Sequence, residues 1–214
     1  MVIAAGGRGQ RTGSDVPKQF ATLAGRPLFL WSLDTFMTWG CDEIVLVVPP
    51  DHIPWTERHL GDLTAQVVAG GDVRQQSVAN GLERVSAGIV FVHDAARPFV
   101  ELRVLDELVK ALDAADAAIP VVPVDETLKH ISEDVVTRTV ERAGLALSQT
   151  PQAFRGEVLR EAHVRASAEG RSVTDDAELI ELYKGTVATV RGSRTNIKLT
   201  YPEDFALAEA MVAS

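Results

Sequence analysis

The sequence predicts a single α/β domain whose mostly parallel central sheet is flanked by helices and which carries a protruding β-hairpin arm. Up to Val124, short runs rich in β-branched residues alternate with longer amphipathic segments. Buried strands that alternate with helices are typical of a parallel sheet covered on both faces. After Val124 two extended segments follow one another without a helix between them. With 214 residues the chain can bury one core, so we expect one domain over residues 1–214.

The elements of the first half can be assigned in order from these patterns. Strands are expected at residues 2–5, 44–48, 66–69, 89–92 and 117–122, and helices at residues 27–39, 73–85 and 102–115. In open α/β sheets ligands bind at the carboxyl ends of the strands. The loops that follow these strands are therefore where we expect the chemistry.

The arm is the segment from about residue 125 to residue 147. Its residues 125–131 and 135–141 have the pattern of two strands joined by the polar turn Ser132-Glu133-Asp134, which predicts an antiparallel hairpin outside the parallel sheet. Because an isolated hairpin is only marginally stable in water, we expect it to pack on another body such as a second subunit. After the arm, helices are expected at residues 154–168, 175–183 and 202–212, and strands at residues 186–190 and 197–199.

Composition and charge exclude several classes of function. The formal net charge of −9 argues against sequence-independent binding of nucleic acid, which requires a basic surface. No apolar run approaches the roughly 20 residues that span a bilayer. The single cysteine, Cys41, cannot form an intramolecular disulfide, which agrees with a reducing compartment. We therefore expect a cytoplasmic protein that binds neither nucleic acid nor membrane.

A glycine-rich loop follows the first expected strand. It reads Ala4-Ala5-Gly6-Gly7-Arg8-Gly9-Gln10-Arg11-Thr12-Gly13, and Lys18 follows shortly after it. Glycines let the backbone approach a ligand and aim N–H groups at phosphate oxygens, whose charge Arg and Lys neutralise. A Walker A loop is absent from this stretch, and Thr12 occupies the third glycine position of the dinucleotide fingerprint, which disfavours a nicotinamide-dependent oxidoreductase. We interpret the loop as a cradle for a triphosphate.

Further motifs extend this pattern over nearly the whole chain. They are Pro17-Lys18-Gln19, Gly70-Gly71-Asp72-Val73-Arg74-Gln75-Gln76-Ser77, His93-Asp94-Ala95-Ala96-Arg97-Pro98, Thr150-Pro151-Gln152, Asn196-Ile197-Lys198 and Pro202-Glu203-Asp204. Together they resemble the nucleotidyltransferases that activate sugars, and among these the 2-C-methyl-D-erythritol 4-phosphate cytidylyltransferases. The resemblance implies a Rossmann-like domain and a reaction in which the phosphate of methylerythritol phosphate attacks the α-phosphorus of CTP. It also implies release of pyrophosphate, Mg²⁺ as cofactor, and a homodimer in which the arm embraces the partner subunit.

The resemblance also implies roles for individual residues. Arg11 and Lys18 are the expected catalytic residues, because they match positions that stabilise the transition state in the family. The loop has one residue more than the family pattern, and Gly9-Gln10-Arg11 keeps the Gly-x-Arg spacing, so we align Arg11 rather than Arg8 with the family arginine. The expected nucleotide-binding residues are Ala4, Ala5, Gly6, Gly71, Asp72, Ser77 and Ala95. The residues expected to position the sugar phosphate are Asp94, Arg97, Thr127, Arg142, Thr150 and Lys198.

Several of these residues also have a purely structural interpretation. Asp94 would end a strand at the sheet edge that suits Mg²⁺, directly or through the CTP phosphates, and we favour this interpretation over the alternative that it caps the next helix or pairs with Arg97. Asp72 would serve as the N-cap of the helix at residues 73–85, and Arg142 as a solvated arginine of the hairpin. His93 should face away from Asp94 and pack. The remaining histidines and Cys41 show no triad or metal-binding spacing, and we expect them to be structural.

Two other functions remain open at this level. A ribitol 5-phosphate cytidylyltransferase would share the nucleotide half of the site, so the pocket around Thr127, Arg142 and Lys198 would decide between the two substrates. A non-catalytic protein that senses nucleotides would keep the fold but would not need Arg11, Lys18 and Lys198 together.

Overall fold

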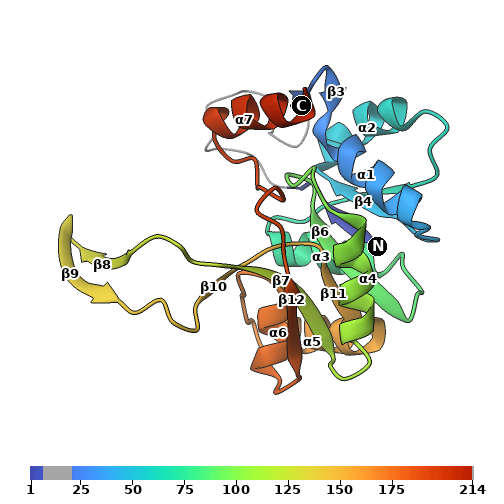
Figure 1. The fold of residues 1–214 in the computed structure, drawn as a ribbon. Helices are drawn as coiled ribbons and strands as arrows, with labels where there is room; N and C mark the ends of the chain where they lie inside the picture. The colour runs from blue at the N-terminus through green and yellow to red at the C-terminus, as the bar shows by residue number, and fades with distance from the viewer. Residues whose placement is uncertain (7–20, 214) are drawn as a thin grey trace.

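The computed structural model describes residues 1–6 and 21–213 and confirms the predicted α/β architecture (Figure 1). Four strands, β5 (Gln66–Ala69), β4 (Val45–Val48), β1 (Val2–Ala4) and β6 (Ile89–Asp94), lie side by side in that order and run parallel. All four residues of β4 are buried aliphatic side chains, as expected of a strand covered on both faces.

The other half of the sheet contains the antiparallel pairs. Strand β11 (Gln152–Arg155) pairs antiparallel with both β6 and β7 (Ala117–Pro123), and β12 (Val187–Arg191) pairs parallel with β7. The short strand β10 (Ala146–Ser148) also pairs antiparallel with β7. Because Val121 pairs with both β10 and β12, these two strands lie on opposite edges of β7, and β10 is on the β11 side.

Strands β10 and β11 were not predicted from the sequence pattern. The segment up to residue 147 was expected to stay outside the sheet, which is wrong at its end because Ala146 and Leu147 pair with β7. A cis peptide bond joins Thr150 to Pro151 between the two strands. The polar run Gln149-Thr150-Pro151-Gln152 hides the alternating pattern by which a strand is recognised.

Helices cover both faces of the sheet, and each face has its own core. Alternate residues of β1 point to opposite sides, so Ile3 packs with α1 (Leu28–Trp39) and α4 (Leu102–Ala111), while Val2 packs with the helices of the other face. The helices of that other face are α3 (Arg74–Leu82), α5 (Gly156–Ala168) and α6 (Asp176–Leu182). The C-terminal helix α7 (Pro202–Val212) packs near β2 (Thr22–Leu23), which pairs with β3 (Arg26–Pro27).

Two further differences from the sequence analysis concern proline and isolated backbone contacts. Helix α2 (Ile53–Leu60), preceded by the 3₁₀ turn Pro50–His52, was not predicted, although Pro54 lies in the first turn of the helix, where proline is well tolerated. Residues 197–199 were expected to form a strand and do not. Their backbone is held by single hydrogen bonds instead, such as the one from Leu199 N–H to the Ala96 carbonyl.

The predicted hairpin is present and projects from the body of the molecule (Figure 1). Strands β8 (Leu128–Ser132) and β9 (Val135–Val140) pair antiparallel as a sheet of their own. Glu133 and Asp134 between them have φ values of 48° and 63°, the left-handed pair that a tight two-residue hairpin turn requires. Among the described residues, no helix is long and apolar enough to cross a membrane.

Candidate active site

The candidate site lies where β1, β6 and β5 end. Ala4 and Asp94 are the last residues of β1 and β6, and they pair in register. The Ala95 N–H donates to the Ala4 carbonyl at 3.1 Å, and the Ala5 N–H donates to Val47 of the neighbouring strand at 2.8 Å. Three of the predicted nucleotide-binding residues, Ala4, Ala5 and Ala95, are therefore neighbours at the carboxyl edge of the sheet, as expected for parallel strands.

Ser77 of α3 lies beside Gly6 and Gly71, two further predicted nucleotide-binding residues. Its Oγ accepts a hydrogen bond from the Gly71 N–H at 3.1 Å and donates to the Val73 carbonyl at 3.1 Å. A Cβ added to Gly6 or to Gly70 would lie 3.0 Å from this oxygen, so the ends of β1 and β5 approach Ser77 closely because both positions are glycine. The structure thus brings Gly6, Gly71 and Ser77 together.

Asp72 does not cap helix α3. The N-cap is Val73, which forms no side-chain cap, and the Asp72 N–H instead donates to Gln76 Oε1 at 3.1 Å. The capping interpretation of Asp72 is therefore wrong, because Gln76 reaches back to satisfy the backbone at this end. The Asp72 side chain is exposed beside Gly71, where its predicted contact with the nucleotide stays a prediction.

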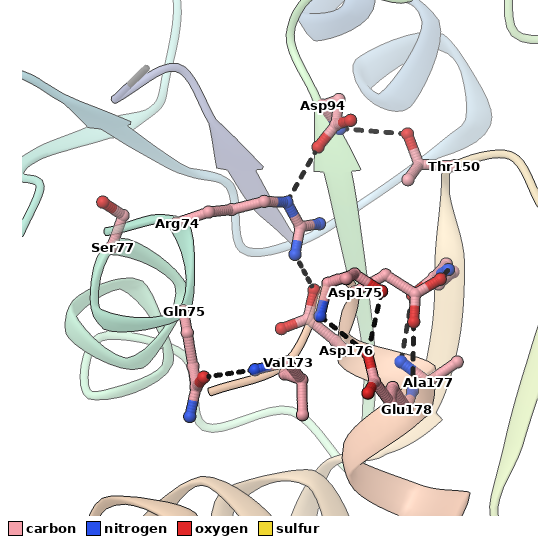
Figure 2. A network of polar contacts seen from close by, with 12 residues as sticks. Arg74, Gln75, Ser77, Asp94, Thr150, Val173, Asp175, Asp176, Ala177 and Glu178 are labelled. Atoms are coloured by element: carbon pink, nitrogen blue, oxygen red, sulfur yellow. Dashed lines mark hydrogen bonds and ion pairs between the residues drawn. The ribbon is translucent and has the colours of Figure 1, made fainter. Parts of the chain in front are cut away.

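Asp94 belongs to a charged cluster, and Figure 2 shows its contact with Arg74. Its Oδ1 accepts from Arg74 Nε at 3.1 Å, and its Oδ2 accepts from Lys198 Nζ at 2.6 Å. Burial opposes ionisation of Asp94, but the charges of Arg74 and Lys198 outweigh it and hold the pKa of this carboxyl well below its usual range. The carboxylate is therefore ionised at neutral pH. The alternative pairing of Asp94 with Arg97 is wrong, because Arg74 and Lys198 occupy its two oxygens.

His93 faces away from the site and is fully buried, as the sequence predicted. Its Nε2 lies 3.0 Å from the Arg97 carbonyl, and its Nδ1 lies 3.1 Å from the Thr150 hydroxyl, which itself accepts from the Asp94 N–H at 3.0 Å. A carbonyl only accepts, so Nε2 carries the proton and Nδ1 accepts from Thr150. Burial lowers the pKa of His93 to about 4, which keeps the ring neutral.

Arg97 and Thr150 hold the loop that carries Lys198. Arg97 Nη1 donates to the Asn196 carbonyl at 2.8 Å, and Asn196 Nδ2 donates to the Thr150 carbonyl at 2.9 Å. Thr150 is only 5% exposed. The structure therefore connects both residues to Lys198 and Asp94 through internal hydrogen bonds, and their direct contact with a sugar phosphate stays a prediction.

Thr127 and Arg142 lie apart from this cluster, at the base of the arm. Both side chains are exposed. Arg142 donates to the Asp125 carbonyl, and the Asp125 carboxylate pairs with Arg194. Within the described part of the chain, no hydrogen bond or ion pair joins Thr127 or Arg142 to the Asp94 cluster. The predicted catalytic residues Arg11 and Lys18, and Arg8 with them, lie outside the described residues.

Arg74 and Asp176 complete the cluster, and the sequence pattern assigned a role to neither of them. Arg74 Nη1 donates to Asp176 Oδ2 at 2.6 Å, and Asp176 Oδ1 lies 3.2 Å from His163 Nε2. One signal was available, because a cation as the first residue of a helix opposes the helix dipole and calls for a nearby anion. The partner itself was not predictable, since Asp176 is 102 residues away in the chain.

The donors around Asp94 fit an indirect role toward Mg²⁺. Over residues 1–6 and 21–213, no group of three or more His, Cys, Asp or Glu side chains is arranged to hold a metal ion. Both oxygens of Asp94 already accept from cationic groups, so a metal ion bound directly would share this carboxylate with Arg74 and Lys198. Mg²⁺ commonly keeps several waters and binds substrate phosphates with few protein ligands. Asp94 thus suits contact with the ion through water.

Comparisons with known proteins identify the family and agree with this fold. The family model described as IspD: 2-C-methyl-D-erythritol 4-phosphate cytidylyltransferase matches residues 1–214. The 2-C-methyl-D-erythritol 4-phosphate cytidylyltransferase of Geobacillus kaustophilus (strain HTA426) is 43% identical over 219 residues, which cover 100% of this chain and 96% of that protein. The bifunctional enzyme IspD/IspF of Rhodopseudomonas palustris (strain BisA53) is also 43% identical over 100% of this chain, but the match spans 55% of that longer protein.

The solved structures give the same result. The crystal structure of 2-C-methyl-D-erythritol 4-phosphate cytidylyltransferase from Thermus thermophilus matches with a TM-score of 0.88 and 38% identity, covering 100% of this chain and 98% of that one. The structure of the bifunctional IspDF from Campylobacter jejuni matches with a TM-score of 0.81 over 95% of this chain and 52% of that one. From the match along its whole length, this chain belongs to the 2-C-methyl-D-erythritol 4-phosphate cytidylyltransferase family.

Proposed function

We propose that this protein transfers CMP from CTP to 2-C-methyl-D-erythritol 4-phosphate, giving 4-diphosphocytidyl-2-C-methyl-D-erythritol and pyrophosphate in the non-mevalonate route to isoprenoid precursors. The observation that carries the proposal is the Asp94 cluster: Asp94 and Lys198 meet at the carboxyl edge of the sheet, beside the glycine-lined start of α3. The single cysteine and the nucleotide substrate suit a cytoplasmic enzyme.

The reaction needs positioning and charge rather than a protein nucleophile. The attacking phosphate oxygen is already anionic, so the protein must align it with the α-phosphorus and neutralise the charge of the transition state. The start of α3 is a suitable place for the nucleotide, because helix N-termini attract anions. The Lys198 side chain is 43% exposed, so its ammonium can exchange Asp94 for the phosphate of the incoming sugar. Arg11 and Lys18 would add the charge that stabilises the transition state.

Mg²⁺ would bind the triphosphate and neutralise part of its charge when CTP is present. Asp94, whose two oxygens also accept from Arg74 and Lys198, would be the residue that holds the ion at this edge of the sheet, directly or through water. In this arrangement Asp94 would have two functions, because it positions the Lys198 ammonium and would help to hold the metal ion.

We also infer a two-fold homodimer that forms through the arm, residues 125–147. Ile131 and Val136 of the hairpin pair across the two strands and are 60% and 55% exposed, so the arm presents apolar side chains that a partner could cover. A hairpin that does not pack on its own domain gains stability from a second copy. Arg142 from the arm would then act in the partner's site together with the partner's own copy of Lys198.

The test of the function measures pyrophosphate release. The protein is incubated with CTP, Mg²⁺ and either methylerythritol phosphate or ribitol 5-phosphate. Turnover with methylerythritol phosphate alone supports the proposal. Equal or faster turnover with ribitol 5-phosphate would change the substrate, and tight CTP binding without turnover on either would favour a nucleotide sensor.

The test of the dimer mixes two inactive variants. Arg142→Ala and Lys198→Ala proteins are co-refolded, and heterodimers are isolated by means of two affinity tags. A shared site predicts that these heterodimers regain part of the activity, because one of their two sites contains both residues. Isolated heterodimers that stay inactive contradict the shared site. So does a wild-type protein that is fully active and whose mass, measured by light scattering, is that of a monomer.

A further inference from the structure

Arg74 lies between two carboxylates that come from different elements (Figure 2). It is the first residue of α3, and its guanidinium donates from Nε to Asp94 at the end of β6 and from Nη1 to Asp176 at the start of α6. The distances are 3.1 Å to Asp94 and 2.6 Å to Asp176. The planar Arg74 guanidinium therefore connects α3 with the end of β6 and the start of α6. A lysine ammonium cannot bridge two carboxylates with the same geometry.

Asp176 is the buried end of this chain of contacts. Its side chain is 1% exposed, and its second oxygen accepts from His163 Nε2 at 3.2 Å. Burial opposes its ionisation, but Arg74 and then His163 outweigh it and lower the pKa of Asp176. Both oxygens are thus engaged, and the carboxylate faces Arg74 as a fixed negative charge.

Capping of α6 does not explain Asp176. The preceding residue, Asp175, is the N-cap, and its Oδ1 accepts from the Glu178 N–H at 3.0 Å. Gln152 also holds this end of the helix, since its Nε2 donates to Asp175 at 2.8 Å and its Oε1 accepts from the Ala177 N–H at 3.3 Å. The helix start is therefore fixed without the Asp176 carboxylate, which leaves Arg74 and His163 as its partners.

The charges of the cluster balance. Arg74 and Lys198 carry two positive charges, and Asp94 and Asp176 carry two negative ones. Because Asp176 satisfies one side of Arg74, the other side meets Asp94 Oδ1 and leaves Oδ2 for Lys198. Without the charge on Asp176, Arg74 is free to take both oxygens of Asp94, and the Lys198 ammonium loses its fixed place.

We propose that Asp176 is a positioning residue of the transfer reaction. By holding Arg74 against one oxygen of Asp94, it fixes the position of the Lys198 ammonium before the sugar phosphate binds. The inference rests on the proposed function, because Lys198 is assigned to the sugar phosphate there. Asp176 itself is too deeply buried to touch a substrate, so it acts through Arg74 and Asp94.

The first experiment compares Asp176→Asn with Asp175→Asn in the steady-state pyrophosphate assay. Both variants lose one negative charge at neighbouring positions of the same helix start, and asparagine remains a good N-cap at position 175. Asp176→Asn should lower kcat about 10-fold, because the residue that orients Arg74, and through it Asp94, is lost. It should also raise KM for the sugar phosphate about 5-fold while KM for CTP stays the same, because Lys198 is displaced.

Asp175→Asn should stay within about 2-fold of the wild type in all three constants, since it leaves the Arg74 contacts intact. Partial unfolding gives a different result, because it lowers kcat and leaves both KM values unchanged. Wild-type constants for Asp176→Asn, or the same KM shift in Asp175→Asn, refute the positioning role. A wild-type protein without turnover removes the proposed function, and this role with it.

A double-mutant cycle tests whether Asp176 acts through Arg74. Arg74→Met removes the guanidinium that links Asp176 to Asp94, so adding Asp176→Asn should change kcat and KM no further. Independent, multiplying effects of the two substitutions refute the route. Arg74→Lys keeps the charge but cannot bridge two carboxylates, and it should show the KM shift of Asp176→Asn. It serves as the test if circular dichroism shows Asp176→Asn to be unfolded, and wild-type constants for Arg74→Lys refute the proposal.

Discussion

Gly81 of α3 offers a test of how closely this helix must approach the sheet. A Cβ at this position would lie 2.6 Å from Val2 Cγ1 and 2.8 Å from Val47 Cγ2. Carbon atoms pack at about 3.5–4.0 Å, so Gly81→Ala requires a movement of about 1 Å. Val2 and Val47 are both fully buried, and valine side chains are stiff, so neither can turn aside.

Two opposing effects decide the size of the change. Overpacking a well-packed core costs about 1–3 kcal/mol, and two contacts below 3 Å with buried β-branched side chains place Gly81→Ala in the upper half of that range. Alanine returns about 1 kcal/mol, because glycine is a poor helix former. We therefore expect the free energy of unfolding to fall by about 1–2 kcal/mol.

Urea unfolding followed by circular dichroism measures this difference, with the slope m expected to stay constant. Gly88→Ala is the matched control, since a Cβ at Gly88 meets nothing within 4 Å. That variant should be as stable as the wild type or slightly more stable. A Gly81→Ala protein as stable as the wild type refutes the reasoning. Because α3 carries Ser77 and Arg74, the movement should also lower kcat.

Three further results are expected. Arg11→Ala or Lys18→Ala should lower kcat about 10²–10³-fold with the fold intact, whereas Arg8→Ala should cost far less; a critical Arg8 in the same assay would mean that the loop alignment is wrong. The pKa of His93 is about 4 in the folded protein and 6.5 in a model compound, so in this window the unfolded chain binds a proton that the native state does not. The free energy of unfolding should therefore fall by about 2 kcal/mol from pH 7 to pH 5, and by much less in His93→Gln; equal slopes in urea titrations of the two proteins would contradict this. Chelation of Mg²⁺ by EDTA should stop pyrophosphate release and added Mg²⁺ should restore it, while persistent turnover in EDTA would contradict a metal requirement.

The parts of the fold that could be predicted are those with a local pattern. The strands that became β1, β4, β5, β6 and β7 are short runs rich in aliphatic residues, and their order placed Asp94 at the carboxyl edge of the sheet. The hairpin was also recognisable, because its turn residues and its alternation lie within a few positions of one another. Ser77 was predicted for the site by its motif, although its close approach to Gly6 and Gly70 is visible only in the structure.

The parts that could not be predicted depend on long-range contacts. Asp176 meets Arg74 across 102 positions, and Lys198 meets Asp94 across 104. Strand β11 lies between β6 and β7 although it follows both in the chain, and no pattern within its four residues predicts that position in the sheet. Such pairings are decided by the packing of the whole sheet, which overrides local preference.

The place of β11 in the sheet has a consequence for biosynthesis. Strands β1, β4, β5 and β6 pair with one another in parallel and all lie within the first 94 residues, so this half can assemble while the rest of the chain is still being made. The described partners of strand β7 are β10, β11 and β12, and all three emerge from the ribosome after it. In that interval the unpaired backbone N–H and C=O groups along its edges are open to pairing with other chains, and Pro120 and Pro123, which lack the N–H group that a ladder needs, limit that aggregation.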